Sequence, residues 1–285
     1  MKVSVILPAY NEEDSIKEVV EGIYSAVGKD TEVIVVDDSS VDGTAKIAQE
    51  CGAKVVRNPY NMGNGAAVKR GIRQARGEVI VLMDADGQHS SHDIPRLLKD
   101  MDKFDMVIGQ RYASGQKIWR RLANKIYNIL ATYVSGVKIK DLTSGFRAIR
   151  KDKAIKFLYL LPNTFSYPTT LTLSFIKASF PVLFVPVRTL SRKKGRSKIN
   201  LFSDGLRFFV IIIKISIFFS PLKIFLPVSV LFFLFGFLYY LYTFINFHHF
   251  TNMSALLFTT SVIIFMLGLI SEQIAFLRME KSEEQ

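Results

Sequence analysis

Two long apolar segments near the carboxyl end constrain this chain more than any other feature of its sequence. They run from Leu222 to Phe247 and from Ser254 to Leu277, and each is long enough to cross about 30 Å of hydrocarbon as a helix. The connection His248–Met253 contains no lysine or arginine, whereas basic residues flank the pair on both outer sides. Because basic flanks stay in the cytoplasm, residues 222–278 are predicted to form a transmembrane hairpin with both ends cytoplasmic. Two buried helices of a soluble core are the alternative.

The distribution of charge indicates which anionic partner this basic chain meets. Its formal net charge of +12 suits either nucleic acid or an anionic membrane surface. Between Arg188 and Lys223 basic residues far outnumber the single acid, Asp204, and this stretch leads into the first apolar segment. We therefore expect a membrane partner and no nucleic-acid partner. Residues 200–221 are expected to form an amphipathic interfacial helix, and residues 279–285 a cytoplasmic tail.

Cysteine content and the amino-terminal sequence point to a reducing compartment. Cys51 is the only cysteine, so neither an intramolecular disulfide nor a thiolate metal cluster can form. The apolar run that ends at Pro8 is too short for the hydrophobic region of a signal peptide. We therefore expect an integral membrane protein whose first domain stays in the cytoplasm.

The amino-terminal part of the chain alternates between short apolar runs and segments in which apolar residues recur at helical spacing. The predicted strands are Val3–Leu7, Glu32–Val36, Ala53–Arg57 and Val79–Met83. The predicted helices between them are Asp14–Val27, Gly43–Cys51 and Gly65–Ala75. This order predicts an α/β domain with a doubly wound, mostly parallel sheet over residues 1–199. In such sheets ligands bind beyond the carboxyl ends of the strands.

Acidic side chains follow the predicted strands at the edge where a ligand would bind. Asp37 and Asp38 come after the second strand, and Asp84 and Asp86 come after the fourth. Repulsion among so many carboxylates is costly unless a cation or hydrogen-bond donors offset it. Hard oxygen ligands suit a divalent metal that also binds the phosphates of a nucleotide. The sequence therefore predicts a metal and nucleotide site at this edge.

Six motifs give the chain a resemblance to a known family. They are VSVILPAYNEE, VIVVDDSSVDGT, NPYNMGNGAAVKRGI, LMDADGQHSSHDIPRLL, IGQRY and DLTSGFRAIRK. Over most of residues 1–205 the chain resembles the family 2 glycosyltransferases of GT-A fold, within them the dolichol-phosphate mannose synthase and polyprenyl-phosphate glycosyltransferase group. The resemblance implies a Rossmann-like GT-A domain that transfers a hexose from a nucleotide-sugar, of the GDP-mannose or UDP-glucose type. The acceptor would be a polyprenyl phosphate at the cytoplasmic membrane face, and the anomeric carbon would be inverted.

The resemblance also assigns roles to residues of these motifs. It places a nucleotide-sugar site at Pro8, Tyr10, Glu12, Asp37, Asp38 and Asp84. It implies that Mg²⁺ or Mn²⁺ is held by Asp84, Asp86 and Gln88, where the metal neutralises the leaving diphosphate. Catalytic roles fall to Asp84, Asp86, Arg111 and Arg147. The residues expected to bind the acceptor phosphate are Arg120, Arg121, Ser144, Arg196 and Lys198.

Three features of these motifs have competing explanations. Helix capping explains Asp42 and Asn11 as well as ligand binding does. The turn Gly63–Gly65 opens a predicted helix and could cradle a phosphate, but a glycine pair is a weak signal. Asp141 is expected to orient either Arg147 or the acceptor.

Three other sites are unusual. The segment Phe165–Thr170 has no acidic residue, whereas many relatives carry acids there, and this departure leaves the identity of the sugar open. His89 follows the metal motif, but a histidine in a loop before a helix is more often a bystander. Glu272, near the end of the second apolar segment, is expected to reach headgroup depth or to pair between helices.

Two other functions remain as alternatives. A glycosyltransferase of the same fold that elongates a glycan on a hydroxyl acceptor would need a placed carboxylate base. An acceptor phosphate, with a second pKa near about 6, is already a nucleophile at neutral pH. The non-enzyme alternative is a membrane scaffold or lipid-binding module. The sequence leaves open which sugar, nucleotide and polyprenol are used, and whether the chain forms a homo-oligomer.

Overall fold

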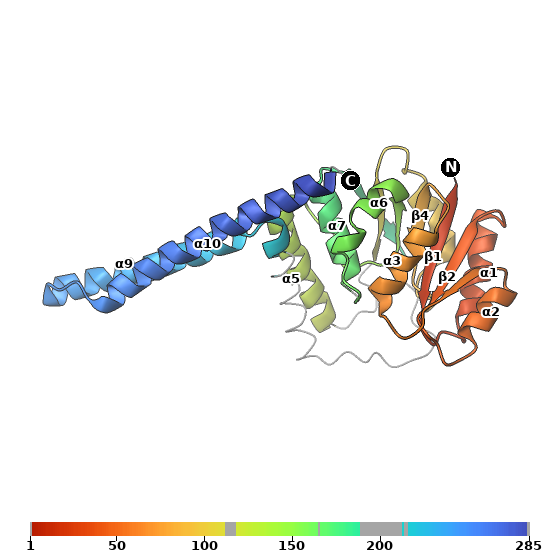
Figure 1. Cartoon of the computed structure of the whole chain (residues 1–285), viewed down its shortest axis with the longest axis horizontal. Helices are drawn as coiled ribbons and strands as arrows, with labels where there is room; N and C mark the ends of the chain where they lie inside the picture. The colour runs from red at the N-terminus through yellow and green to blue at the C-terminus, as the bar shows by residue number, and fades with distance from the viewer. Residues whose placement is uncertain (1, 112–117, 165, 189–212, 214–215, 284–285) are drawn as a thin grey trace. The chain divides into compact units, whose positions relative to one another are not determined.

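The computed structural model describes residues 2–111, 118–164, 166–188, 213 and 216–283 (Figure 1). Spatial contacts divide the chain into two units. The first contains Met1–Thr132 and Val137–Leu201, and the second contains Tyr133–Gly136 and Phe202–Gln285. The first unit thus covers the predicted catalytic domain, and the second contains the predicted hairpin. Most of the predicted interfacial helix, residues 200–221, lies outside the described residues.

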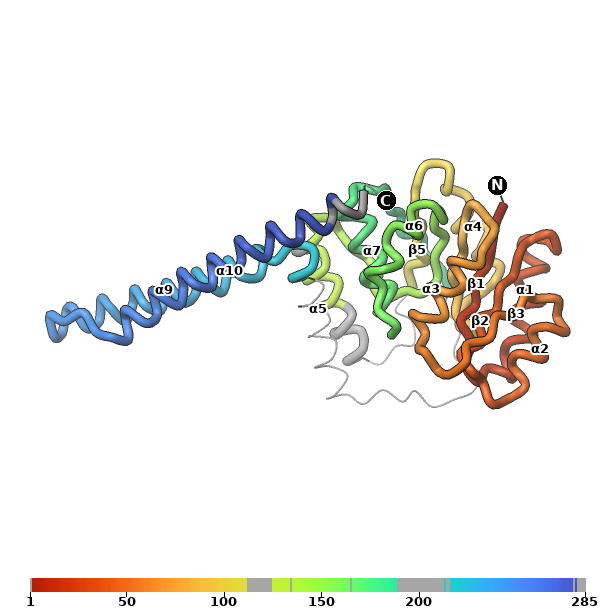
Figure 2. Tube along the Cα trace, in the orientation of Figure 1, coloured from red at the N-terminus to blue at the C-terminus, as the bar shows by residue number. Residues whose placement is uncertain are grey.

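A seven-stranded sheet forms the centre of the first unit, with strand order β3-β2-β1-β4-β6-β5-β7 (Figure 2). Its strands are β1 (Val3–Ala9), β2 (Glu32–Asp37), β3 (Lys54–Arg57), β4 (Val79–Leu82), β5 (Met106–Arg111), β6 (Arg147–Arg150) and β7 (Val182–Val187). Neighbouring strands are parallel except at β6, which runs antiparallel to both β4 and β5. The mostly parallel α/β sheet that the sequence predicts is confirmed, with one reversed strand.

Helices cover both faces of this sheet, so its central strands are buried on both sides. One face carries α1 (Ile16–Val27), α2 (Thr44–Glu50), the short 3₁₀ turn Ser91–Asp93 and α4 (Ile94–Leu98). The other face carries α3 (Asn64–Gln74), α6 (Lys151–Lys156), the 3₁₀ turn Leu158–Leu160 and α7 (Tyr167–Lys177). Val5 and Val33 pack on the first face, whereas Ile6 and Ile34 pack on the second. Because side chains alternate along a strand, a strand buried on both faces is an uninterrupted apolar run in sequence.

The first four strands and first three helices lie within two residues of their predicted bounds. The later elements of the first unit were not predicted. They include β5, β6, β7 and the helix α5 (Ile118–Ser135). β6 inserts between β4 and β5, and its first residue, Arg147, pairs with Leu82 at the carboxyl end of β4. The amino end of β6 therefore reaches the same sheet edge as the carboxyl ends of the parallel strands.

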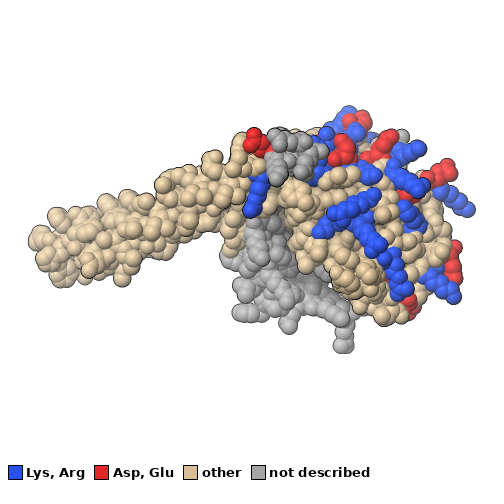
Figure 3. All heavy atoms as spheres, viewed as in Figure 1, with Lys and Arg blue, Asp and Glu red and all other residues tan. Residues whose placement is uncertain are grey.

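The second unit contains the predicted hairpin, formed by α9 (Leu222–Phe247) and α10 (Asn252–Glu283). Both helices are long and apolar enough to cross a membrane, over Leu222–Phe247 and Asn252–Arg278. Figure 3 shows them without charged side chains along most of their length. The predicted pair of spans is confirmed as helices. α10 continues to Glu283, so residues 279–283 extend this helix instead of forming a separate tail.

Polar and small residues join α9 to α10. The Ser229 hydroxyl donates to the Ser261 carbonyl, and the Ser261 hydroxyl donates to the Ser229 carbonyl, each at 2.9 Å. At the base of the pair, the backbone N–H of Leu222 donates to the Glu272 carboxylate at 3.0 Å. Hydrogen bonds between helices and small residues at the contact stabilise helix pairs in lipid. Of the two expectations for Glu272, the structure shows the pairing between helices.

Candidate active site

The candidate site lies where the carboxyl ends of β1, β2 and β4 meet the amino end of β6. Ala9, the last residue of β1, is in register with Asp37, the last residue of β2. Leu82 at the end of β4 is in register with Arg147. The loops that follow these strands carry Tyr10, Asp38 and Asp84 to one edge, as is usual for the ligand-binding edge of an open α/β sheet.

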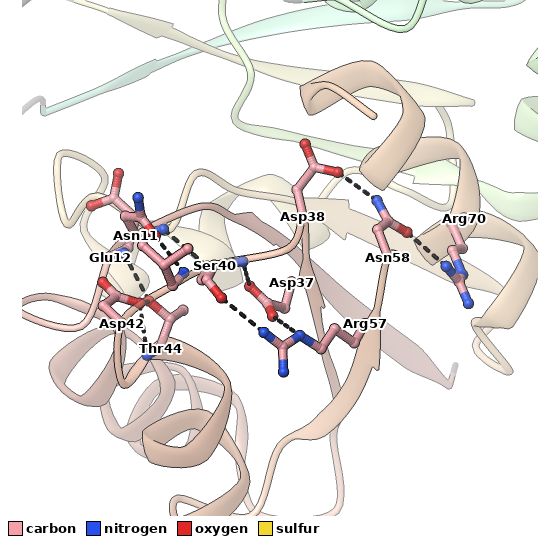
Figure 4. Close-up of polar contacts among 11 residues, drawn as sticks. Asn11, Glu12, Asp37, Asp38, Ser40, Asp42, Thr44, Arg57, Asn58 and Arg70 are labelled. Carbon is pink, nitrogen blue, oxygen red and sulfur yellow. Dashed lines mark hydrogen bonds and ion pairs between the residues drawn. The ribbon is translucent and has the colours of Figure 1, made fainter. Parts of the chain in front are cut away.

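Hydrogen bonds join the loop after β1 to the loop after β2 (Figure 4). The backbone N–H of Asn11 donates to the Ser40 hydroxyl at 3.0 Å, and the N–H of Val41 donates to the Asn11 side-chain oxygen at 3.0 Å. Asn11 has a positive φ of 56°, which asparagine tolerates better than most residues. The N–H of Glu12 donates to the Thr44 hydroxyl at 2.8 Å. Asn11 therefore links two loops and does not cap a helix.

Asp42 stabilises the start of α2. Its carboxylate accepts a hydrogen bond from the N–H of Thr44 at 3.0 Å and another from the Thr44 hydroxyl. Partial burial acts to raise its pKa, but the hydrogen bonds from Thr44 and from the N–H of Glu13 hold the pKa of Asp42 below its ordinary value. Of the two explanations for Asp42, helix capping and ligand binding, its hydrogen bonds with Thr44 at the start of α2 support the first.

Asp37 is completely buried beneath these loops. It accepts a hydrogen bond from the N–H of Ser40 at 3.0 Å, and the Arg57 Nε lies 3.2 Å from its other oxygen. Arg57 also donates to the Ser40 carbonyl at 2.8 Å. Asp37 therefore fixes the loop after β2 to the end of β3. It lies buried behind the ligand-binding edge of the sheet and supports the loop there.

Asp38 organises the loop that leads from β3 to α3. One of its oxygens accepts a hydrogen bond from the Asn58 side-chain amide at 2.6 Å (Figure 4). The two oxygens also accept hydrogen bonds from the N–H groups of Met62 and Gly63, each at 2.8 Å. Arg70 in turn donates to the Asn58 side-chain oxygen at 2.7 Å. Asp38 is only 3% exposed. Its carboxylate holds the loop between β3 and α3 at the candidate site, and the sequence did not reveal Asn58 as its partner.

The other residues predicted to contact the nucleotide differ in exposure. Pro8 is buried within β1, where it is in register with Val36. Tyr10 is 47% exposed directly after β1, and Glu12 is half-buried. Tyr10 can therefore present its ring to a ligand at this edge. Pro8 can affect the edge only through its place in the backbone of β1. Contact between these residues and a nucleotide stays a prediction.

The glycine pair at the start of α3 is explained by close packing. The N–H of Gly65 donates to the Asn163 carbonyl at 3.0 Å. A methyl group at Gly65 would lie 2.1 Å from the Pro162 carbonyl, and one at Gly63 would lie 2.4 Å from the Asn163 carbonyl. The N–H of Gly63 is bound to Asp38. The amides of Gly63 and Gly65 already have partners within the chain, so phosphate binding by this turn stays a prediction that these hydrogen bonds do not favour.

Asp84, Asp86 and Gln88 lie together in the loop after β4, and all three are half-buried. The N–H of Gln88 donates to Asp86 at 3.1 Å, and Gly87 between them has a φ of 72°, so the loop turns back on itself. Across the described part of the chain, no three His, Cys, Asp or Glu side chains converge as a complete metal site. Two carboxylates and an amide oxygen fit a hard cation that takes its remaining ligands from phosphate oxygens and water.

Arg111 at the end of β5 is paired with Asp141. Its Nε and NH2 groups donate to the two Asp141 oxygens at 2.9 and 3.0 Å, and NH2 also donates to the Thr143 hydroxyl at 2.6 Å. Burial acts to lower the pKa of Arg111, but the hydrogen bonds to Asp141 raise it above its ordinary value. Arg111 therefore keeps its charge in a fixed orientation. Asp141 orients this arginine and not Arg147, which corrects the expectation from sequence.

Arg147 is fully buried at the start of β6. Its guanidinium donates to the Pro168 carbonyl and the Thr172 hydroxyl, each at 3.0 Å, and to the Ser144 carbonyl. Burial lowers its pKa to about 10, so the group remains charged at neutral pH. In this geometry Arg147 joins β6 to the first turn of α7 beneath the site. Its predicted contact with a phosphate therefore stays a prediction that the observed hydrogen bonds do not favour.

Ser144 and the basic residues predicted to bind the acceptor are less fully defined. The Ser144 hydroxyl is buried and has no hydrogen-bond partner among the described residues. Arg120 and Arg121 belong to α5 by their backbone, but their side chains lie outside the described residues. Arg196 and Lys198 also lie outside them.

Two residues beside Asp84 are not among the predicted site residues, although the sequence drew attention to one of them, His89. His89 is 6% exposed, its ring stacks on Phe146 with centroids 5.0 Å apart, and its Nε2 lies 3.9 Å from the Asp84 carboxylate. Burial, reinforced by the charge of Arg111, lowers the pKa of His89 to about 4. Tyr167, the first residue of α7, is also buried, and burial and Asp84 both raise the pKa of its phenol. Motif position pointed to His89, but nothing in the sequence placed Tyr167 opposite Asp84.

The arrangement of this site and of the hairpin agrees with two domain families. Residues 4–158 match Glycosyl transferase family 2, and residues 220–277 match the GtrB C-terminal hairpin. The chain belongs to glycosyltransferase family 2. It is therefore an enzyme that transfers a sugar, and the scaffold alternative is not retained. The hairpin match agrees with insertion of α9 and α10 into a membrane.

Three curated relatives of this glycosyltransferase act on polyprenyl or dolichyl lipids by name. The dolichol-phosphate mannosyltransferase of Pyrococcus furiosus is 37% identical over 70% of this chain and 60% of its own length. The polyprenol monophosphomannose synthase of Mycolicibacterium smegmatis is 33% identical over 69% of this chain and 80% of its own length. The undecaprenyl-phosphate 4-deoxy-4-formamido-L-arabinose transferase of Pseudomonas fluorescens is 31% identical, over 71% and 63% respectively. The chain spans less than two thirds of the first and third.

A solved structure shows the same fold in a more distant protein. The glucosyl-3-phosphoglycerate synthase of Mycobacterium tuberculosis was crystallised with Mn²⁺, UDP and glucosyl-3-phosphoglycerate. It superposes on this family 2 glycosyltransferase with a TM-score of 0.63 at 20% identity, covering 75% of this chain and 80% of that protein. The similarity confirms the GT-A fold.

Proposed function

We propose that this family 2 glycosyltransferase transfers a hexose from a nucleotide-sugar to a polyprenyl phosphate at the cytoplasmic face of a membrane. The observation that carries the proposal is the presence, in one chain, of a half-buried Asp84–Asp86–Gln88 loop at the ligand edge and an apolar helix hairpin. The first feature suits a diphosphate donor, and the second brings the enzyme to an acceptor that cannot leave the membrane. The relatives' names support the same pairing.

The donor site would use the loops after β1, β2 and β4. Tyr10 and Glu12 contact the base and ribose, on a wall that Asp37 and Asp38 hold in shape. Asp84, Asp86 and Gln88 would hold a divalent cation, Mg²⁺ or Mn²⁺, which supplies charge neutralisation at the leaving diphosphate. The relatives' names include two different sugars, mannose and 4-deoxy-4-formamido-L-arabinose, so the donor is proposed by class, as a nucleotide-sugar of the GDP-mannose or UDP-glucose type.

The reaction is a single displacement. An oxygen of the acceptor phosphate forms a bond to the anomeric carbon, the bond from that carbon to the diphosphate breaks, and the nucleoside diphosphate leaves with the electron pair. Configuration inverts. Because the acceptor is largely a dianion at neutral pH, no carboxylate base is required. Arg111, whose orientation is fixed by Asp141, would stabilise phosphate charge in the transition state.

The acceptor phosphate would be bound by basic residues outside the donor loops. The proposed set is Arg120, Arg121, Ser144, Arg196 and Lys198. Guanidinium groups bind phosphate through paired hydrogen bonds, which fixes orientation as well as charge. Arg196 and Lys198 precede the hairpin in sequence, which suits a phosphate at the headgroup level.

A donor and acceptor screen tests the proposed function directly. The full-length protein in lipid nanodiscs is incubated with a panel of labelled nucleotide-sugars, each with polyprenyl phosphate or with unphosphorylated polyprenol. We expect label in the lipid extract with one donor, only when the phosphate is present. Label that enters the unphosphorylated lipid or a water-soluble glycan would show a hydroxyl acceptor and overturn the proposal.

The orientation of the hairpin gives a second test. In a Cys51→Ser background, His249→Cys places a single thiol between the two spans, and Val41→Cys places one on the catalytic unit, where Val41 is 88% exposed. With a membrane-impermeant maleimide and sealed vesicles of known orientation, we expect the two thiols to label from opposite sides. Labelling of both from the same side would contradict the hairpin topology. Labelling of Val41→Cys from the vesicle side that corresponds to the outside of the cell would contradict a cytoplasmic catalytic unit.

A further inference from the structure

Asp84 is enclosed by a group of residues to which the proposed mechanism gives no role. Gly145 lies just before β6, Tyr167 begins α7, and His89 follows the Asp84–Gln88 loop. These three residues come from separate parts of the chain. The reversed direction of β6 brings the first of them to the edge where β4 ends.

Gly145 is the point where Asp84 and Tyr167 meet. A methyl group at this position would lie 3.1 Å from one Asp84 carboxylate oxygen, 3.4 Å from the other, and 3.3 Å from the Tyr167 hydroxyl. The two shorter distances are tighter than most contacts of a methyl group, so a side chain at position 145 would press on the Asp84 carboxylate and the Tyr167 phenol. Glycine at this position lets both groups approach the same point.

The imidazole of His89 approaches the same carboxylate from another side. Its Nε2 is 3.9 Å from the Asp84 oxygen that also faces Gly145, and its ring is held by stacking on Phe146, the next residue after Gly145. The His89 Nδ1 is buried without a hydrogen-bond partner among the described residues. An unsatisfied buried nitrogen costs free energy, and such costs concentrate at functional sites.

We propose that Tyr167 is a positioning residue for Asp84. Gly145 and His89 lie against the same carboxylate and limit its orientation together with Tyr167. The phenol comes from α7 and the imidazole from the loop after β4, so together they limit the orientations open to the Asp84 carboxylate. This inference rests on the proposed function, which assigns Asp84 to the donor and its divalent cation. It adds a residue of α7, from the segment Phe165–Thr170, to the donor site.

The test compares Tyr167→Phe, which removes one hydroxyl, with the matched variant Tyr159→Phe, which removes a hydroxyl from a side chain that is 59% exposed. Full-length proteins in nanodiscs are titrated by calorimetry with GDP and with UDP, in Mn²⁺ and in EDTA. We expect Tyr167→Phe to weaken Mn²⁺-dependent binding about tenfold, because Asp84 loses a polar neighbour that limits its orientation. Binding in EDTA and the unfolding temperature should stay as in Tyr159→Phe.

Gly145→Ala provides a second variant, because its methyl group displaces Asp84 without removing a hydroxyl. We expect the same selective loss of Mn²⁺-dependent binding. If both variants bind as the wild type does, or lose binding equally in Mn²⁺ and EDTA, Tyr167 does not position Asp84 and the inference fails while the proposed function stands. If the wild type binds neither nucleotide in Mn²⁺, the proposed donor site and this inference both fail.

Discussion

Asp86→Ala is expected to lower sugar transfer by at least about a hundredfold while leaving the fold intact. Metal coordination at a leaving diphosphate stabilises the transition state by several kcal/mol, and each 1.4 kcal/mol changes a rate about tenfold. Asp86 is half-buried in a loop, where its carboxylate accepts a hydrogen bond from the N–H of Gln88 in that same loop. Its removal also relieves repulsion from Asp84, so the unfolding temperature should not fall.

The measurement is initial transfer rate across a series of Mg²⁺ and Mn²⁺ concentrations, together with thermal unfolding of the detergent-solubilised protein. Asp102→Ala is the matched control, because Asp102 is an exposed carboxylate in a turn away from the sheet edge. Transfer by Asp86→Ala at the rate of Asp102→Ala, at every metal concentration, would exclude Asp86 from the mechanism. A rate restored by high metal would show that Asp86 contributes affinity for the cation and that the other ligands suffice for catalysis.

Of the variants proposed, Asp38→Ala is expected to have the largest effect on stability. It should lower the free energy of unfolding by at least about 3 kcal/mol. The change leaves three donors without an acceptor, namely the Asn58 amide and the N–H groups of Met62 and Gly63. A buried donor left unsatisfied costs about 1–3 kcal/mol. Asp38→Asn keeps the shape and one acceptor oxygen, so its loss should be intermediate.

Cys51 provides the measurement, because this single cysteine is partly buried at the end of α2 in the catalytic unit. Its rate of reaction with a thiol dye, followed across a urea series in detergent, reports unfolding of that unit. Nucleotide binding is measured in parallel below the transition. Asp38→Ala with unchanged stability and lost nucleotide binding would mean that Asp38 contacts the nucleotide directly and that its bonds to the 58–63 loop contribute little.

Local sequence signals were sufficient for the first half of the sheet and for the hairpin. Strands β1 to β4 are apolar runs separated by amphipathic helices, so periodicity determines their type. α9 is apolar along most of its length, and the length of that run indicates a helix. Strand β6 has no such signal. Its four residues, Arg147–Arg150, carry a basic residue at each end, and its place between β4 and β5 depends on pairing with strands distant in sequence.

The same limit separates what was and was not predicted at the candidate site. Strand position placed Asp38 and Asp84 at the ligand edge, because they follow the predicted strands Glu32–Val36 and Val79–Met83, whereas only the family resemblance pointed to Arg111. Their partners could not be inferred, since Asn58 and Asp141 become neighbours of these residues only after the sheet has formed. The glycine pair at the start of α3 is likewise explained by close contact with the Pro162 and Asn163 carbonyls, which lie far along the chain.

The central position of β6 also determines how the sheet can assemble while the chain is being synthesised on the ribosome. Strands β1 to β4 can pair with one another once β4 has been made, but the second partner of β4 is β6, which comes later. Within the described sheet β5 pairs only with β6 and β7, and both follow it in the chain. Until Arg150 has emerged, the apolar β4 presents an open edge to solvent, and such edges invite pairing with other chains. The nascent catalytic unit is therefore most vulnerable to misassembly during translation of the α5 region, after the nucleotide half has formed and before β6 closes the sheet.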